Sequence, residues 1–200
     1  LKEFNKLGYY KFRSDYNSLK DKSSEEALDL LYLLVVYAFN NDMRFNRNGD
    51  FNLPIGKTDL NKNNIKKVKN YIERVSKIDC AFICGDFREK KIQNILIKSD
   101  FIYADPPYLI GDAVYNEMGN WTEKTEQELI NLLEVLNKNK KKFALSNILN
   151  KVGAKNKPLS DWLFQRKDLH IIDINYHYRS ASYNKINRNA REREVLIKNF

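Results

Sequence analysis

The sequence predicts an α/β domain with a mostly parallel sheet, preceded by a helical region that contains a turn-rich insert. After residue 80, short apolar runs alternate with longer amphipathic segments, which is typical of parallel strands joined by helices. Before residue 80, apolar residues recur at helical spacing. The chain has 200 residues, 42% of them hydrophobic, enough for one sizeable core. We therefore expect one domain with an insertion, divided into a helical region over residues 1–77 and an α/β region over residues 78–200.

The helical region carries a helix-start signal and a hairpin signal. Ser23-Ser24-Glu25-Glu26 precedes an apolar run over residues 27–39, with a serine placed to cap and acids near the positive end of the helix. This predicts a substantially buried helix. Asn48-Gly49 lies between two arms that bear aromatic residues, which predicts a hairpin over residues 42–57 with a two-residue turn. Residues 60–77 return to helical spacing.

The α/β region contains five apolar runs of strand length. We expect strands at residues 80–84, 100–104, 142–147, 169–178 and 194–198, and helices at residues 123–138 and 158–166. Cys80 and Cys84 stand at the two ends of the first strand, roughly 13 Å apart at about 3.3 Å per residue, beyond disulfide reach. Buried, reduced thiols are therefore expected.

Composition limits the partners and the compartment. The chain has 35 Lys and Arg against 26 Asp and Glu, a formal net charge of +9, which favours a polyanion such as nucleic acid. The alternative explanation is that the composition of the source genome favours Lys, Asn and Ile in its proteins generally. Apolar runs long enough to span a membrane are missing, so we expect a cytoplasmic protein with no membrane partner. The two histidines lack further ligands at suitable spacing, so no metal is expected.

The most informative stretch is Phe101-Ile-Tyr-Ala-Asp105-Pro106-Pro107-Tyr108, where an apolar strand stops at two prolines. Proline fixes φ and lacks an N–H donor, so Asp105 and Tyr108 project from a stiff corner beyond the strand. A carboxylate, a carbonyl freed because a proline follows it, and an aromatic face together suit an exocyclic amino group on a base. The alternative is a proline-rich turn in which Tyr108 simply packs.

A glycine-rich cofactor loop is missing from these residues. Nucleotide-type cofactors on sheets of this kind usually bind at a glycine-rich turn after the first strand, and the seven glycines here are all isolated. Either residues that precede Leu1 carry this loop and the first strands, or the chain cannot hold such a cofactor alone.

Three motifs in a fixed order carry a family resemblance. An Arg44-Phe45-Asn46 to Gly56 insert, the Asp105 corner and a downstream Phe143-Ala-Leu-Ser-Asn147 strand resemble the Dam-type (D12 class) DNA adenine-N6 methyltransferases. The resemblance covers essentially all 200 residues and departs from the family's pattern in the absent cofactor loop. It implies a Rossmann-like methyltransferase sheet, mostly parallel with an antiparallel last strand, of which the N-terminal strands are not in these residues. Residues 1–77 would be the target-recognition region, and residues 78–200 the C-terminal part of the catalytic domain.

The resemblance also implies the chemistry. S-adenosylmethionine would be the methyl donor, no metal would take part, and duplex DNA would be bound by a monomer of a bacterial or phage-type, nucleoid-associated enzyme. The catalytic residues would be Asp105, Pro106, Pro107 and Tyr108. Asp105 and the Pro106 carbonyl would accept hydrogen bonds from adenine N6 as its charge develops, while Tyr108 stacks on the flipped base. Asp105 would also contact the amino-acid end of the donor, with Asp86 and Phe87 at its adenine, although Gly85-Asp86 also reads as a strand-exit turn.

The hairpin is the expected DNA reader. Arginine makes the commonest specific contact to guanine, and Arg44 stands on the first arm. By resemblance, the DNA-binding residues would be Arg44, Asn46, Asn52, Pro54, Phe39, Asn40, Lys57 and Arg13. Phe39-Asn40 would wedge into the base stack, Lys57 would meet phosphate, and the role of Arg13 is open. For each residue, a solvated or locally bonded side chain is the alternative. The target sequence expected from the family is GATC.

Two other functions are compatible with parts of this pattern. Glutamine-modifying protein methyltransferases use a related corner with Asn in place of Asp, which Asp105 and the basic hairpin argue against. A catalytically incomplete fragment, or the DNA-binding half of an assembly, would bind DNA without turnover. Restriction-modification and solitary marking are both compatible with the sequence.

Overall fold

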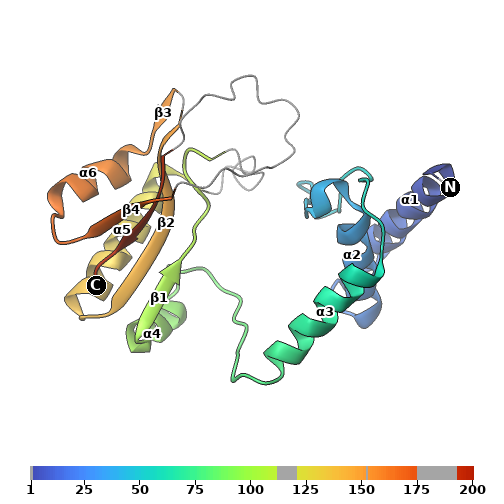
Figure 1. The fold of residues 1–200 in the computed structure, drawn as a ribbon, viewed down its shortest axis with the longest axis horizontal. Helices are drawn as coiled ribbons and strands as arrows, with labels where there is room; N and C mark the ends of the chain where they lie inside the picture. The colour runs from blue at the N-terminus through green and yellow to red at the C-terminus, as the bar shows by residue number, and fades with distance from the viewer. Residues whose placement is uncertain (1, 112–120, 152, 175–192) are drawn as a thin grey trace. The chain divides into compact units, whose positions relative to one another are not determined.

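A computed structural model describes residues 2–111, 121–151, 153–174 and 193–200. Its contacts divide the chain into two compact units, Leu1–Phe82 (unit 1) and Ile83–Phe200 (unit 2), each of which is described by itself (Figure 1). The division expected from the sequence lies between residues 77 and 78. No helix of the described residues is long and apolar enough to cross a membrane.

Unit 1 is built from helices. Its elements are α1 (Lys2–Ser18), α2 (Glu25–Tyr37), the short 3₁₀ helix η1 (Phe39–Asn41) and α3 (Lys62–Val75). The expected cap is confirmed: the Ser24 hydroxyl accepts a hydrogen bond from the Ala27 N–H at 3.2 Å, and two glutamates occupy the first turn of α2. A small core joins α1, α2 and the hairpin, and consists of Tyr9, Tyr16, Ala27, Leu34, Ala38, Phe51 and Leu53.

The hairpin has a longer turn than the sequence predicts. Its arms meet at isolated bridges, Phe45 to Phe51 at the tip and Ala38 to Ile55 at the base. The Asn46 N–H donates to the Asp50 carbonyl at 2.8 Å, which leaves three residues in the loop. Gly49 takes a positive φ of 83°. The two-residue turn was therefore wrong, because a three-residue loop with a left-handed third residue also suits an Asn-Gly pair.

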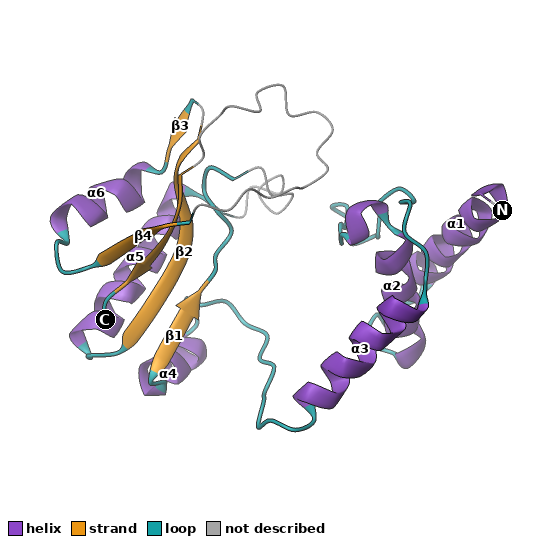
Figure 2. Ribbon diagram, viewed as in Figure 1, coloured by secondary structure: helices purple, strands orange, loops and turns teal. Residues whose placement is uncertain are grey.

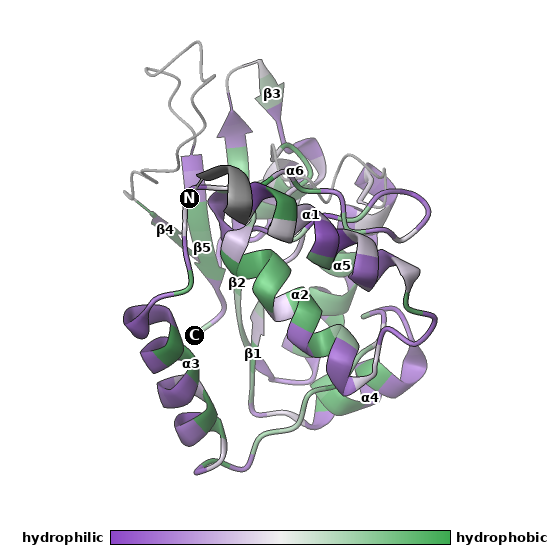
Figure 3. Cartoon of the chain, turned by 90° about the vertical axis from the view of Figure 1, so that its right-hand side faces the viewer, coloured by the Kyte–Doolittle hydropathy of each residue, from purple (hydrophilic) through white to green (hydrophobic). Residues whose placement is uncertain are grey.

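The strand predicted at residues 80–84 is also wrong, since these residues form an irregular segment. Phe82 is 77% exposed, and both cysteines are exposed rather than buried. A strand needs a neighbour for its backbone hydrogen bonds, and no described strand pairs with this segment. Helix α3 likewise has no buried residue, although Figure 3 shows apolar and polar residues on opposite sides of it.

Unit 2 contains the sheet, in the order β1-β2-β5-β4 (Figure 2). The strands are β1 (Phe101–Ala104), β2 (Lys142–Lys151), β4 (His170–Asp173) and β5 (Arg193–Lys198), and the short β3 (Ala154–Lys155) pairs with β2. β1 and β2 are parallel, and β5 is antiparallel to both of its neighbours, β2 and β4. β1, β2 and β4 therefore share one direction, which confirms the mostly parallel sheet with an antiparallel last strand. Residues 175–178 of the fourth expected strand lie outside the described residues.

The described part of unit 2 also contains the helices α4 (Lys90–Lys98), α5 (Glu123–Lys138) and α6 (Lys157–Gln165). Both expected helices are confirmed, and α5 has the bounds predicted from the sequence. α5 and α6 pack on each other and on β2. The core of unit 2 includes Ile102, Leu129, Leu133, Leu136, Phe143, Leu145, Leu159, Trp162, Val195 and Ile197.

Candidate active site and DNA-reading hairpin

The parallel register of β1 and β2 positions the corner, residues Asp105–Tyr108. Ala104, the last residue of β1, pairs with Leu145 of β2. Asp105 and Ser146 follow this pair, so they lie side by side at the carboxyl end of β1, where β2 continues to Lys151. Ligand sites in open α/β sheets lie at this edge. The sequence correctly predicted that the strand ends where the prolines begin.

Hydrogen bonds hold one oxygen of the Asp105 carboxylate. The Ser146 hydroxyl donates to Asp105 Oδ1 at 2.7 Å, and the Tyr108 hydroxyl reaches the same oxygen at 3.2 Å. The Tyr103 hydroxyl in turn donates to Ser146 Oγ at 3.2 Å. The Ser146 hydroxyl proton is thereby directed at Asp105, so the carboxylate has a defined orientation although Asp105 is exposed.

Two acceptors at the corner make no hydrogen bond to the described residues. Asp105 Oδ2 has no partner there, because both donors address Oδ1. The Pro106 carbonyl also accepts no hydrogen bond there, and Pro107, which follows it, has no N–H. A pair of free acceptors close together in the chain suits a donor with two N–H groups, such as an exocyclic amine.

Tyr108 lies between two carboxylates. Its hydroxyl is 3.4 Å from Glu194 Oε1 as well as 3.2 Å from Asp105. Burial, together with the negative charges of Asp105 and Glu194, raises the pKa of Tyr108 above its usual range. The phenol therefore remains a neutral hydrogen-bond donor, and its bond to Asp105 holds the hydroxyl beside the carboxylate.

The expected donor-binding residues lie in the loop before α4. The Phe87 ring packs on Trp121, with centroids 5.7 Å apart, and both belong to the edge of the core. Asp86 accepts from Arg88 through both oxygens, at 2.9 Å and 2.6 Å, and these bonds lower the pKa of Asp86 to about 2. Phe87 thus offers a braced aromatic face that fits an adenine ring, whereas the Asp86 carboxylate is already engaged by arginine.

In unit 1, side chains of α1 hold the second arm of the hairpin. Tyr9, Arg13 and Asn17 follow each other at intervals of four residues and therefore share one face of the helix. Tyr9 and Arg13 donate to the Leu53 carbonyl at 2.9 Å and 3.2 Å. Asn17 exchanges two hydrogen bonds with the Phe51 backbone, at 2.8 Å and 3.1 Å. Arg13, which was predicted to bind DNA without a defined role, thus supports the backbone of the hairpin.

The base of the hairpin is joined to the end of α2. The Gly56 N–H donates to the Tyr37 carbonyl at 2.7 Å, and the Phe39 N–H donates to the Pro54 carbonyl at 3.0 Å. A Cβ on Gly56 would lie 2.3 Å from the Ala38 carbonyl oxygen, so only glycine fits this approach.

Two predicted readers on opposite arms bind each other. Arg44 Nε donates to Asn52 Oδ1 at 2.8 Å, and Nη2 lies 3.4 Å from the Asn52 carbonyl. Its Nη1 makes no hydrogen bond to the described residues. Asn52 therefore orients the guanidinium of Arg44, and the N–H groups of Nη1 remain available to donate to another acceptor. Arg47, which the sequence reasoning passed over, lies exposed in the loop without a charged partner among the described residues.

The other predicted DNA-binding residues of the hairpin differ in whether their side chains are bonded within the turn or exposed. Asn46 uses its side chain inside the turn, where it accepts from the Asn48 and Asp50 N–H groups and donates to the Asp50 carboxylate. Pro54 and Lys57 are exposed. Phe39 is 47% exposed, and Asn40 beside it has a left-handed backbone with φ 58°.

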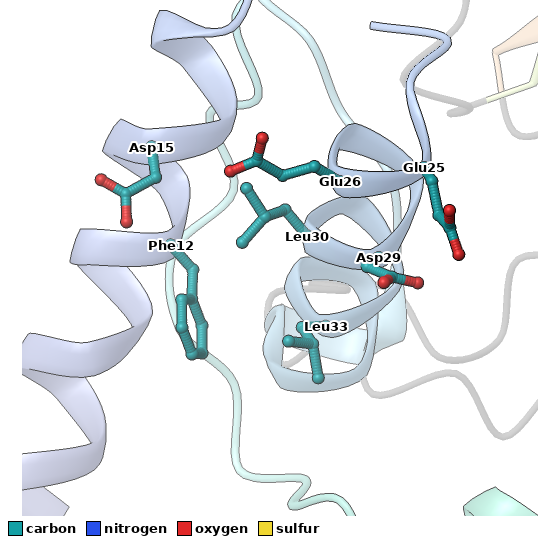
Figure 4. A pocket seen from close by; sticks show the side chains of 7 residues that line it. All are labelled: Phe12, Asp15, Glu25, Glu26, Asp29, Leu30 and Leu33. Carbon is teal, nitrogen blue, oxygen red and sulfur yellow. The ribbon is translucent and has the colours of Figure 1, made fainter.

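A hollow between α1 and α2 is lined by acidic side chains, in contrast to the basic hairpin (Figure 4). Its carboxylates come from both helices, and its lining comprises Phe12, Asp15, Glu25, Glu26, Asp29, Leu30 and Leu33. Carboxylates repel phosphate, so this hollow does not suit a nucleic-acid backbone.

Several residues at the corner were missed from the sequence. Ser146 belongs to the Leu-Ser-Asn motif, but the sequence reasoning assigned it no role. Tyr103 and Glu194 carry no local signal, because the sheet alone brings them to Ser146 and Tyr108. The parallel alignment of two strands that each end in polar residues was the one signal available for Ser146.

This sheet and its corner define a Rossmann-like methyltransferase fold. The family model of the D12 class N6 adenine-specific DNA methyltransferases matches residues 1–188, and the chain belongs to this family. It is 32% identical over 206 residues to Modification methylase StsI of Streptococcus sanguinis, and 33% identical over 207 residues to Type II methyltransferase M.FokI of Planomicrobium okeanokoites. Both alignments cover 100% of this chain and 30% of the relative. Retron Ec67 DNA adenine methylase of Escherichia coli is 29% identical over 129 residues, which are 64% of this chain and 43% of the relative. The chain thus spans about a third or less of the length of the first two relatives.

Proposed function

We propose that this protein transfers a methyl group from S-adenosylmethionine to N6 of an adenine flipped out of duplex DNA, as a modification methylase of a restriction-modification system. The observation that carries this proposal is the pair of acceptors at the corner, Asp105 Oδ2 and the Pro106 carbonyl, which make no hydrogen bond to the residues that the structure describes. Membership of the family and the names of its relatives support the same reaction.

The corner acts by accepting hydrogen bonds. The lone pair of adenine N6 is delocalised into the ring, so the nitrogen becomes nucleophilic only as it turns tetrahedral and gains positive charge. Asp105 and the Pro106 carbonyl stabilise that charge through the two N–H groups. Ser146 and Tyr108 hold the carboxylate in place, so little reorganisation accompanies the reaction.

The donor and the base need separate binding faces. S-adenosylmethionine supplies the electrophilic methyl group when it is bound. Phe87, braced by Trp121, would hold its adenine together with Asp86, and Asp105 would also hold its amino-acid end. Tyr108 stacks on the flipped base. No step requires a metal ion.

The hairpin selects the site on DNA. Arg44, oriented by Asn52, contacts a guanine edge in the major groove. Phe39 with Asn40 enters the stack as the target base leaves it, while Lys57, Pro54, Asn46 and Arg13 complete the surface beside the DNA. The protein binds DNA as a monomer, and GATC is the target sequence we propose.

A methylation assay tests the proposal. The whole protein is incubated with labelled S-adenosylmethionine and duplexes that contain GATC or one altered base pair, and N6-methyladenine is identified by mass spectrometry. We expect N6-methyladenine and a preference for GATC. Methylation of another sequence would overturn the target but keep the reaction, whereas a product other than N6-methyladenine would overturn the reaction.

A further inference from the structure

A buried carboxylate outside the proposed reaction centre connects its two halves. Glu126 lies in the first turn of α5 and is 1% exposed. It accepts hydrogen bonds from three side chains: Trp121 Nε1 at 2.6 Å, Asn156 Nδ2 at 2.7 Å and Asn147 Nδ2 at 3.0 Å. Burial of a carboxylate is costly, and three donors with the positive end of the helix offset that cost.

The neighbouring backbone fixes the orientation of both asparagines. The Ile148 N–H donates to Asn147 Oδ1 at 2.8 Å, and the Leu159 N–H donates to Asn156 Oδ1 at 3.2 Å. Since each amide oxygen faces a backbone donor, each amide nitrogen faces Glu126. All three partners of Glu126 are therefore donors, and both of its oxygens must act as acceptors.

One partner leads to the corner. Asn147 directly follows Ser146 in β2, and successive strand residues point to opposite faces of the sheet. Glu126 therefore holds the strand from the α5 side at the position where, from the other side, Ser146 donates to Asp105 at 2.7 Å.

A second partner leads to the donor-binding loop. The indole of Trp121 donates to Glu126 Oε2, and its ring supports Phe87 at a centroid distance of 5.7 Å. The third partner, Asn156, caps α6 and ties the network to the core. One carboxylate thus anchors both the strand that aligns Asp105 and the ring behind Phe87.

We propose that Glu126 is a positioning residue, which keeps the donor-binding face at Phe87 and the acceptor at Asp105 in one mutual geometry. This inference rests on the proposed methyl transfer. Neither Glu126 nor Trp121 contacts the reacting atoms. Their effect is on how well the donor binds and how well it is aligned for transfer.

The chain offers a matched control on the same helix. Glu134 of α5 also accepts an indole N–H, from Trp162 at 2.6 Å, and also bonds Arg166, the residue that follows α6. Its partners lead to α6 and not to the corner. Glu126→Gln and Glu134→Gln remove the same charge from α5, and each puts an amide donor in place of one carboxylate oxygen; at Glu126 both oxygens accept hydrogen bonds, whereas both bonds of Glu134 go to Oε1.

The experiment compares the two variants in the whole protein at a temperature where both are folded. Calorimetric titration measures the Kd for S-adenosylmethionine, and steady-state kinetics separate kcat from KM. We expect Glu126→Gln to raise this Kd about 10-fold and lower kcat/KM about 10- to 100-fold, as misplacement of a reacting group does. Glu134→Gln should change each value less than about twofold, even if it lowers the Tm as much as Glu126→Gln does.

Equal values in the two variants would overturn the role of Glu126. If Glu126→Gln does not fold, Trp121→Phe and its control Trp162→Phe keep an aromatic ring, and each removes the indole donor together with the same part of the ring volume. A larger loss of donor affinity in Trp121→Phe supports the proposal, and equal losses contradict it. A wild-type protein that neither binds S-adenosylmethionine nor methylates adenine would instead refute the proposed function, and this inference with it.

Discussion

In unit 1, polar side chains of the hairpin bond to their own arms and side chains of α1 bond to the hairpin backbone, whereas the corner of unit 2 keeps two acceptors without partners among the described residues. Arg44 bonds to Asn52, Asn46 bonds inside the turn, and Arg13 bonds to the Leu53 carbonyl. At the corner, Ser146 and Tyr108 occupy only one oxygen of Asp105. On the proposed function, the hairpin would be a preformed recognition surface, and the corner a preformed acceptor for a substrate amine.

The two regions are also stabilised differently. The hairpin depends on side chains of α1 that reach backbone carbonyls 34 to 45 residues away. The corner depends on the pairing of β1 with β2, in which Ser146 meets Asp105 across 41 residues. If recognition and chemistry are separate in this way, substitutions in each region should affect one function and spare the other.

The largest expected effect is that of Asp105→Ala. It removes the acceptor for adenine N6, so kcat should fall by at least about 10²- to 10³-fold, while DNA affinity stays within about twofold. Methyl-transfer kinetics and fluorescence anisotropy with labelled duplex measure the two quantities. Asp100→Ala, an exposed carboxylate just before β1, is the control. Near-normal turnover of Asp105→Ala would break the assignment of the corner.

Arg44→Ala should have the converse effect. Loss of a bidentate base contact costs about 1–3 kcal/mol of discrimination, so preference for the target over altered duplexes should fall about 10- to 100-fold with kcat at saturation retained. Arg47→Ala removes the same charge from the loop. It should weaken binding equally for all sequences and reduce the salt dependence. Equal loss of discrimination in both variants would contradict Arg44 as the reader.

Ser146→Ala sharpens the comparison within unit 2. It leaves the Asp105 carboxylate in place but removes the 2.7 Å hydrogen bond that orients it. We expect kcat to fall about 10-fold, which corresponds to the roughly 1–1.5 kcal/mol of one such bond. Ser99→Ala is the control, because the Ser99 hydroxyl bonds only within its own turn, to the Ile95 carbonyl. Unchanged kcat in Ser146→Ala would show that Tyr108 alone suffices.

The smallest expected effect concerns Asp86, whose carboxylate is paired through both oxygens, whereas only one oxygen of Asp105 has a partner among the described residues. Hydrogen bonds from Arg88 lower the pKa of Asp86 to about 2, below the value of about 4 that is usual for aspartate. The pair therefore stabilises the fold above about pH 4, and this contribution is lost as pH falls towards about 2. Because the pair is exposed, Asp86→Asn should lower stability at pH 7 by less than about 1 kcal/mol.

Urea unfolding at pH 7 and at pH 3 measures this difference, with Asp100→Asn as the control. The gap between Asp86→Asn and the wild type should be smaller at pH 3 than at pH 7. A gap that widens in acid would contradict the ion pair as its cause.

Local signals explain which elements the sequence predicted well. The serine before the two glutamates marks the start of α2, and the two prolines mark the end of β1. The amphipathic run at residues 123–138 specifies α5, because its apolar side chains recur at helical spacing. The errors lie where structure depends on neighbours. Residues 80–84 are apolar enough for a strand, but no described strand pairs with them, and the two cysteines are exposed as a result.

By itself, the sequence determined helices α2, α3, α5 and α6, the end of β1, the order of hairpin and corner, and the family to which the chain belongs. These properties depend on residues close together in the chain, on backbone propensities and on motif order. Only the tertiary structure decided which side chains meet: Ser146 with Asp105, Arg44 with Asn52, and Glu126 with Trp121, Asn147 and Asn156. The physical reason is that hydrogen bonds form only within about 3.5 Å, and packing of the strands, helices and arms brings these groups within that distance.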